Sequence, residues 1–223
     1  MTEPTTIAVC AAGLSDVGRR RTNNEDALLV EPDLGLYAVA DGMGGHNAGE
    51  VASGIAIEEL RRSAASVPDA PFLADPSLAN RRALLDWLAR VVGAINAVIH
   101  ERAQLDGALR GMGCTLDVAV LRGRSLFLAH VGDSRVYLGR GGELRALTED
   151  HTLGQLLLQS GAMPAEEVAA NPQRNVLMRA LGPYPAVQVD TAFVDLAPGD
   201  RILLCTDGLY GEVAAPQIAT LLA

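Results

Sequence analysis

The middle of the chain holds a series of short apolar segments separated by turn residues, and this series constrains the fold more than any other feature. Large apolar residues alternate with smaller or polar ones over residues 115–120. Arg122-Gly123-Arg124 then separates them from a second apolar segment over 126–131. Closely spaced strands joined by short turns pair as antiparallel hairpins. Because strands follow one another here with helices grouped between such runs, the chain is predicted to be an α+β protein with antiparallel sheets.

Further strand signals lie on both sides of this region. Strands are predicted over residues 6–14, 27–30, 36–40, 134–139, 143–147, 187–194 and 202–206. Gly141-Gly142 and Pro198-Gly199-Asp200 each separate two of these segments with residues that favour turns. Each turn therefore predicts a hairpin, and the second one would pair the last two strands of the chain.

Two long helices are predicted, over about residues 48–63 and 77–105. In the second helix, apolar side chains recur at spacings of three and four residues and form one face: Leu84, Leu88, Val91, Ile95 and Val98. Ser77 is a suitable cap for its first turn. A length of 223 residues is enough for one domain with a sizeable core. Residues 1–223 are therefore expected to form a single domain.

Acidic residues outnumber basic ones by 27 to 18, which gives a formal net charge of -9. Neither nucleic acid nor an anionic membrane attracts such a surface, so neither is expected as the main partner. No run of about 18 apolar residues is evident that could span a bilayer, and no secretory signal precedes the first strand. Cys10, Cys114 and Cys205 lie far apart, which indicates reduced thiols and a cytoplasmic protein.

Three apolar segments end in an aspartate beside a glycine: Asp41-Gly42, Gly132-Asp133 and Asp207-Gly208. A carboxylate at the end of a buried strand is costly to desolvate unless a cation binds it. Oxygen donors without clustered Cys or His select Mg²⁺ or Mn²⁺ over zinc or copper. The alternative is that each dipeptide is only a turn, because Asp-Gly is common in turns. Three such strand ends, together with Glu25-Asp26, favour a metal site.

Six groups of residues occur in a fixed order between about residues 13 and 212. They are Ser15-Asp16-Val-Gly18 with Arg21-Thr-Asn-Asn-Glu25-Asp26, Ala40-Asp41-Gly42-Met-Gly44-Gly45-His46-Asn-Ala-Gly49-Glu50, Gly111-Met-Gly113-Cys-Thr115, Gly132-Asp133-Ser134-Arg135, Leu147-Thr148-Glu-Asp150-His151 and Cys205-Thr-Asp207-Gly208. In this order they resemble the bacterial branch of the PP2C-type (PPM family) metal-dependent protein serine/threonine phosphatases. The resemblance covers most of the chain.

The resemblance implies a four-layer α-β-β-α sandwich of two antiparallel sheets flanked by helices. A flap of about residues 150–178 would border the catalytic cleft. The implied cofactors are two Mn²⁺ or Mg²⁺ ions at one edge of the sheets, with a third ion in bacterial members. Asp41 would bridge the first two ions, and the carbonyl oxygen of Gly42 would help to hold one of them.

The remaining ligands are implied in the same way. Asp207 would bind the first ion, while Glu25 and Asp26 would support the second ion through water. Asp133 resembles the ligand of the third ion, which Asp207 would share. Asn175 would supply a further oxygen to that ion.

The implied activity is hydrolysis of phosphoserine and phosphothreonine on proteins by a water or hydroxide that bridges the ions. Arg21 is the implied phosphate contact, and with Asp41 the implied catalytic residue, because a guanidinium can grip two phosphate oxygens. Without the resemblance, Arg19, Arg20 and Arg21 are equally well explained as a solvated charged surface. The implied partners are phosphorylated proteins, including a cognate kinase, and the protein is expected to be a monomer.

Two features depart from the family pattern. Met43 stands where many eukaryotic relatives place a histidine that is proposed as a general acid, so metal-bound water would protonate the leaving alcohol. His46 nearby would be structural. Family members also continue beyond the helix after Gly208 to a strand with a final Asp ligand, whereas this sequence ends at Ala223 and looks truncated. The alternative function is therefore an inactive phosphatase-like domain that binds phosphoproteins. A nucleotide-binding loop is disfavoured, because no Gly-Lys-Ser/Thr is present.

Overall fold

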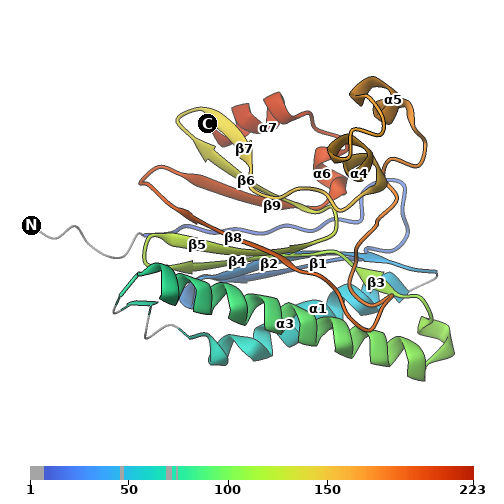
Figure 1. The fold of residues 1–223 in the computed structure, drawn as a ribbon, viewed down its shortest axis with the longest axis horizontal. Helices are drawn as coiled ribbons and strands as arrows, with labels where there is room; N and C mark the ends of the chain where they lie inside the picture. Colours follow the sequence, from blue (N-terminus) through green and yellow to red (C-terminus); the bar gives the residue numbers. More distant parts are fainter. Residues whose placement is uncertain (1–7, 46–47, 69–71, 74) are drawn as a thin grey trace, which may run out of the picture.

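A computed structural model describes residues 8–45, 48–68, 72–73 and 75–223, and it stacks two antiparallel sheets between layers of helices (Figure 1). The larger sheet has the strand order β1-β2-β4-β5-β8, with β3 paired to β2, and the smaller sheet has the order β7-β6-β9. The strands are β1 (Asp26–Glu31), β2 (Leu36–Met43), β3 (Gly113–Cys114), β4 (Leu116–Arg122), β5 (Ser125–Val131), β6 (Arg135–Arg140), β7 (Glu143–Ala146), β8 (Asp190–Asp195) and β9 (Arg201–Cys205).

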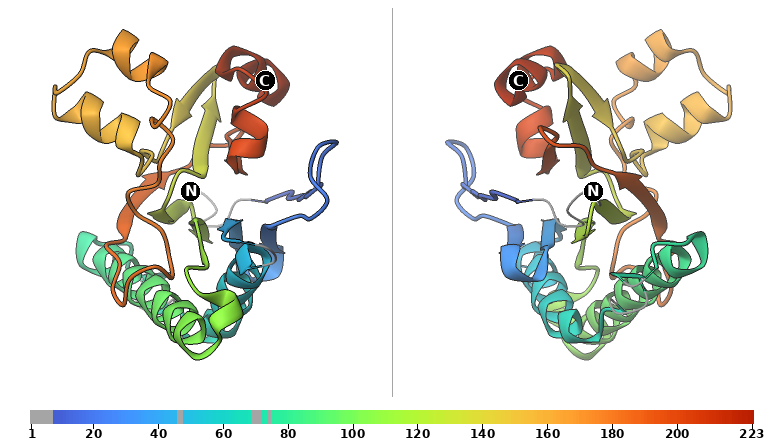
Figure 2. Two further views of the ribbon diagram at one scale, coloured as in Figure 1. Left: turned by 90° about the vertical axis from the view of Figure 1, so that its right-hand side faces the viewer. Right: turned by 90° about the vertical axis from the view of Figure 1, so that its left-hand side faces the viewer.

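Helices cover the outer faces of the two sheets. The α-helices are α1 (Ala48–Ser63), α3 (Leu78–Leu105), α4 (Leu153–Gln159), α5 (Ala165–Ala170), α6 (Asp207–Tyr210) and α7 (Ala215–Leu222). The pair α1 and α3 lies on the larger sheet, α6 and α7 lie beside the smaller one, and α4 and α5 project to one side (Figure 2). Short 3-10 helices are η1 (Pro32–Leu34), η2 (Ala64–Ser66) and η3 (Gly107–Leu109). The expected α+β fold of two antiparallel sheets flanked by helices is confirmed.

Two apolar layers hold this arrangement together. One lies between the larger sheet and the helices α1 and α3, and the other lies between the two sheets. The apolar face of α3 supplies fully buried side chains such as Leu88 and Ile99 to the first layer. By length and composition α3 could also cross a bilayer, contrary to the expectation from the sequence. A core helix passes the same test, and α3 contacts α1 and the larger sheet along its buried face.

The predicted hairpin between the last two strands is wrong. β8 pairs with β5 in the larger sheet, whereas β9 pairs with β6 in the smaller sheet. The connection between them carries Leu196, whose side chain is buried in the apolar layer between the sheets. Asp200 accepts hydrogen bonds from Arg140 and from the amide of Ala197. The turn therefore passes the chain from one sheet to the other.

The strand predicted over residues 6–14 is also wrong where the structure describes it. Residues 8–14 form no strand, and most of their side chains are exposed, with Leu14 at 90%. Residues 6 and 7 lie outside the described residues. A strand requires a neighbouring backbone for its hydrogen bonds, and no such ladder is found for residues 8–14 within the described part of the chain.

The buried face of α3 predicts a clear contrast between two leucines of the same helix. Leu88→Ala should lower the free energy of unfolding by about 2–5 kcal/mol, because it leaves a cavity in the core. Leu78, which is 73% exposed, provides the control, and Leu78→Ala should change stability by no more than about 0.5 kcal/mol. Urea unfolding followed by circular dichroism measures both values. Equal effects of the two substitutions would contradict the packing described.

Candidate active site

The carboxylates predicted from the sequence gather where the strands of both sheets end. Asp26 begins β1 and is the register partner of Asp41 on the neighbouring strand β2. From the smaller sheet, β9 leads into α6, whose first residue is Asp207. The hydroxyl of Thr206 donates a hydrogen bond to Asp26 Oδ2 at 3.1 Å. This bond joins the two sheets at the site.

Hydrogen bonds from Thr115 fix the backbone of Asp41. The Asp41 amide donates to Thr115 Oγ1 at 2.9 Å, and the Thr115 amide donates to the Asp41 carbonyl at 2.8 Å. Thr115 Oγ1 and Ser134 Oγ lie 2.7 Å apart and form a hydrogen bond in which either hydroxyl can donate. Ser134 directly follows Asp133. A buried chain of hydroxyls therefore connects the backbones beside two of the carboxylates.

Gly42 is packed against the first turn of α1 and against the backbone of Glu25. A Cβ atom on Gly42 would lie 2.1 Å from the carbonyl oxygen of Gly49, a distance that no side chain could adopt. The Gly42 amide donates to the Glu25 carbonyl at 3.0 Å, and the buried hydroxyl of Ser53 donates to the same oxygen at 2.6 Å. The glycine is therefore required here for close approach of backbone rather than for a turn.

The carboxylates repel one another. Burial and, after it, the charges of Asp26 and Asp207 raise the pKa of Asp41 to about 8. The charge of Asp133 adds to this rise, whereas Arg21 opposes it. Burial and then the charge of Asp207 raise the pKa of Asp133 to about 6. Burial also raises the pKa of Asp26. Such mutual effects require that these groups lie close together in a poorly solvated place.

Asp133 is held by a brace of aromatic and charged side chains. The hydroxyl of Tyr210 on α6 donates to the Asp133 carbonyl at 2.9 Å. The guanidinium of Arg135 lies 3.7 Å from the centre of the Tyr210 ring and forms two hydrogen bonds, of 2.8 and 2.6 Å, with Asp150. The brace connects the Asp133 turn to the helix that carries Asp207.

These residues fit a divalent metal ion. Their donors are carboxylate and carbonyl oxygens, and the raised pKa values show a concentration of negative charge that a cation would relieve. No three His, Cys, Asp or Glu side chains in the described ranges converge closely enough to form a complete protein cage. Mg²⁺ and similar ions keep several water ligands and need only one or two carboxylates. An open, partly hydrated site is therefore the arrangement that fits.

The structure gives no support for a role of Asn175, and it places Met43 at the end of a strand. Asn175 is exposed in the loop after α5, and no hydrogen bond in the described structure joins it to Asp133 or Asp207. Its role stays a prediction. His46 lies outside the described residues. Met43 ends β2, opposite Gly113 on β3.

Three hydroxyl residues that hold the backbone of the site were not predicted as functional from the sequence. Thr115, Ser134 and Thr206 all stand inside or beside the motifs that carry the resemblance. Their position was therefore visible in the sequence. Their partners were not, because Thr115 meets Asp41 across 74 residues of chain and Thr206 meets Asp26 across 180.

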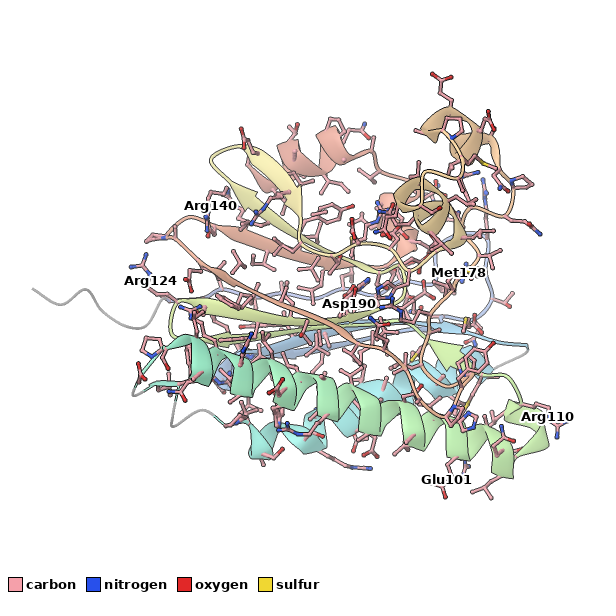
Figure 3. The ribbon with its side chains drawn as sticks, in the orientation of Figure 1. Glu101, Arg110, Arg124, Arg140, Met178 and Asp190 are labelled. Atoms are coloured by element: carbon pink, nitrogen blue, oxygen red, sulfur yellow. The ribbon has the colours of Figure 1, made fainter. Side chains whose placement is uncertain are left out.

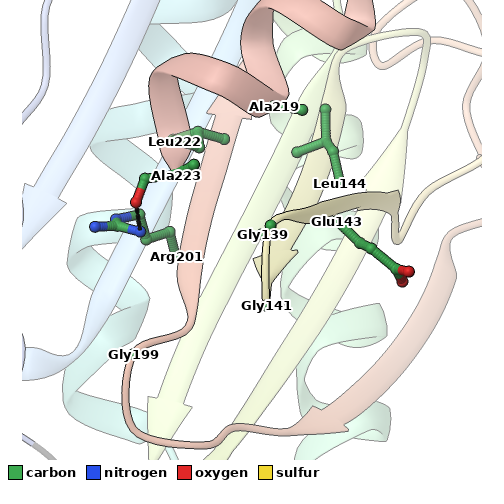
Figure 4. A pocket seen from close by; sticks show the side chains of 10 residues that line it. Gly139, Gly141, Glu143, Leu144, Gly199, Arg201, Ala219, Leu222 and Ala223 are labelled. Carbon is green, nitrogen blue, oxygen red and sulfur yellow. Dashed lines mark hydrogen bonds between the residues drawn. The ribbon is translucent and has the colours of Figure 1, made fainter.

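A separate pocket of about 250 Å³ lies between the β6–β7 turn and α7 (Figure 4). Its walls are mainly glycine and aliphatic residues, and at one side Arg201 donates to the carbonyl oxygen of Ala223 at 2.7 Å. It holds none of the clustered carboxylates. The chemistry therefore belongs to the strand ends and not to this pocket.

Comparison with known proteins gives the same assignment. A profile of the family described as "Protein phosphatase 2C" matches residues 17–221. The protein phosphatase PhpP of Streptococcus pneumoniae is 36% identical over 208 residues, which cover 92% of this chain and 80% of PhpP. The serine/threonine protein phosphatase PstP of Mycobacterium tuberculosis is 39% identical over 213 residues, which cover 96% of this chain but 38% of PstP.

Solved structures agree in fold. The crystal structure of Mycobacterium tuberculosis PstP has a TM-score of 0.79 at 39% identity, covering 93% of this chain and 82% of that one. A catalytic domain of PstP in complex with two manganese ions has a TM-score of 0.77 at 37% identity, covering 93% of this chain and 81% of that one. The expected resemblance to bacterial PP2C-type phosphatases is confirmed. The chain belongs to the protein phosphatase 2C family of metal-dependent serine/threonine phosphatases.

Proposed function

We propose that the strand-end carboxylates and Arg21 form the active site of a phosphatase that hydrolyses phosphoserine and phosphothreonine on proteins. One observation carries the proposal. Asp26, Asp41 and Asp133 lie together at the ends of two sheets with raised pKa values, and Arg21 lies close enough to lower the pKa of two of them. A site with concentrated negative charge and one nearby guanidinium suits divalent cations and a phosphate group together.

Each residue has a proposed role. Asp41 would contact both main ions, the Gly42 carbonyl would help to hold one of them, and Asp207 would bind the first one. Glu25 and Asp26 would support the second ion through water. Asp133 would be the ligand of a third ion, and Asn175 would add an oxygen there. Arg21 would bind the phosphate.

When bound, two Mn²⁺ or Mg²⁺ ions lower the pKa of a water molecule and so supply the nucleophile. The two buried cysteines, Cys114 and Cys205, do not offer an alternative nucleophile at this place. Burial raises the pKa of the Cys205 thiol, beside Thr206, to about 12, and burial also raises the pKa of Cys114. A thiol that stays protonated at neutral pH attacks phosphorus poorly.

The substrates are proposed to be serine- and threonine-phosphorylated proteins, including a cognate kinase. We also propose a cytoplasmic monomer in which residues 1–223 form one domain and about 150–178 form the flap. The separated, unpaired cysteines support the cytoplasmic assignment. The alternative of an inactive phosphoprotein-binding domain is not favoured, because Asp26, Asp41, Asp133 and Asp207 lie together at the site and a relative of the same fold binds two manganese ions.

The activity is tested with a phosphothreonine peptide and Mn²⁺. We expect phosphate release that a chelator abolishes and that added Mn²⁺ restores. Asp41→Asn should lower kcat by at least about a hundredfold, because it removes the proposed bridging charge. Malachite-green detection of phosphate measures each rate. Absence of metal-dependent release above the Asp41→Asn background would refute the proposal.

The role of Arg21 is separable from that of its neighbours. Arg21→Ala should raise KM for the phosphopeptide by roughly ten- to a hundredfold, which corresponds to the loss of a charge-assisted contact with the phosphate. Arg19→Ala, two residues away in the same exposed segment, is the control and should leave KM within about twofold. Equal effects of both substitutions would show that the segment contributes only general positive charge.

The pH dependence of metal binding follows from the raised pKa of Asp41. Its folded pKa of about 8 lies above the unfolded value of about 3.9. Between about pH 4 and about pH 8, the metal-free folded state therefore keeps a proton on Asp41 that the unfolded state has lost. The free energy of unfolding of the metal-free protein falls as pH rises through this range. Because protons compete with the metal, Mn²⁺ should raise Tm more at about pH 7.5 than at about pH 5.5. Thermal melts with Mn²⁺ and with chelator measure the difference, and an equal shift at both pH values would contradict it.

A further inference from the structure

A buried histidine outside the proposed metal site connects the flap to the turn that carries Asp133. The amide of His151 donates to the Gly132 carbonyl at 2.7 Å, and the Gly132 amide donates back to His151 Nδ1 at 3.0 Å. One residue therefore binds both sides of Gly132, which directly precedes Asp133. Gly132 has a φ of 114°, a backbone conformation that residues other than glycine rarely adopt.

The same histidine lies at the base of the flap. Its carbonyl accepts a bond from the Met178 amide at 2.8 Å. Beyond it, the amides of Leu153 and Gly154 donate to the carbonyls of Val176 and Arg174, so the outgoing and returning chains are joined. The returning chain then leads through Met178 to Asp190 at the start of β8 (Figure 3). A displacement of the flap base would therefore act on His151.

The contacts of His151 determine which of its nitrogens carries the proton. A backbone amide can only donate, so Nδ1 must accept the bond from Gly132 and the proton must lie on Nε2. Nε2 then donates to Asp190 Oδ2 at 3.2 Å. Arg179 Nη1 lies 2.9 Å from the same ring nitrogen and also donates to Asp190 Oδ1 at 2.6 Å. His151 is therefore a neutral ring with a single tautomer.

A second buried histidine, His130, packs against this ring. The rings of His130 and His151 lie 4.4 Å apart. His130 Nδ1 contacts the fully buried carboxylate of Asp117 at 2.7 Å, and its Nε2 contacts the Glu149 carbonyl at 2.8 Å. Both ring nitrogens face acceptors, which favours the charged form of His130. A positive neighbour at this distance disfavours a second charge on His151.

We propose that His151 is a positioning residue that locks the base of the flap to the turn carrying Asp133. This positioning role rests on the proposed function, because it matters for catalysis only if Asp133 serves the active site. His151 touches neither substrate nor metal in this role. Its effect is to give the flap base and the Gly132–Asp133 peptide one common geometry.

Two substitutions separate the contacts of His151. His151→Asn keeps an oxygen acceptor at the same number of bonds from the backbone as Nδ1, so it can still receive the Gly132 amide. His151→Gln reaches toward Asp190 but places no acceptor beside Gly132. His100 lies on helix α3, and its Nδ1 contacts the Gly182 carbonyl at 2.8 Å. His100→Asn provides a matched control.

The main measurement is amide hydrogen exchange of the metal-free 223-residue protein, followed by mass spectrometry. For His151→Gln we expect exchange at residues 132–134 and at 152–154 to rise together by roughly tenfold, the effect of losing one buried hydrogen bond. His151→Asn should stay within about threefold of the parent at residues 132–134. In the metal-loaded enzyme, kcat should fall by roughly tenfold for the Gln variant and be largely restored in the Asn variant. His100→Asn should alter none of these values.

Faster exchange at 152–154 alone, or equal exchange at 132–134 in the Gln and Asn variants, would overturn the proposal. If the Gln variant does not fold, the Asn variant decides. Exchange at 132–134 within about threefold of the parent supports the lock, and a tenfold rise refutes it. Exchange requires neither substrate nor metal, so it can fail while the parent protein is active. Inactivity of the parent protein would instead count against the proposed function alone.

Discussion

A cluster of partly buried carboxylates is the constraint on which the rest of this structure depends. Burial is the main cause that raises the pKa values of Asp26, Asp41 and Asp133, and the charge of Asp207 adds to the rise at all three. No folded chain gains stability from such a cluster without a cation, because each charge is both desolvated and opposed. The surrounding fold must therefore hold these groups against an outward force, and the same force is what makes the place attractive to divalent ions.

The fold holds these residues in place mainly through hydrogen bonds to their backbone and not through bonds to their carboxylate groups. Thr115 binds the amide and the carbonyl of Asp41, and Tyr210 binds the carbonyl of Asp133. The carboxylate oxygens stay largely available for other ligands, with Thr206 as a single donor to Asp26. His151 extends the same principle to the Gly132 peptide. Carboxylate oxygens that are held in place but lack hydrogen-bond donors are suited to bind cations.

The stacking of two sheets explains why residues so far apart in the chain share one site. Asp26 and Asp41 come from adjacent strands of the larger sheet, whereas Asp207 follows β9 of the smaller one. Because β8 and β9 belong to different sheets, the connection between them carries the chain across the sandwich. Leu196 fills the space between the sheets at that crossing. The packing of one apolar side chain thus helps to bring the last carboxylate to the others.

The sequence by itself determined the presence of strands, the two long helices and the identity of the acidic residues. Alternation and helical periodicity are local properties, and Asp-Gly pairs at strand ends can be seen without a partner. Short turns also indicated the hairpins β4–β5 and β6–β7, and both are present. Tertiary structure decided the pairings between strands far apart in the chain. The last two strands were predicted as a hairpin and instead joined different sheets, and residues 8–14 found no ladder. It also decided which hydroxyls hold Asp41 and Asp26 and how His151 meets Gly132. Such bonds join groups up to 180 residues apart, and their energy depends on distance in space, which no local pattern records.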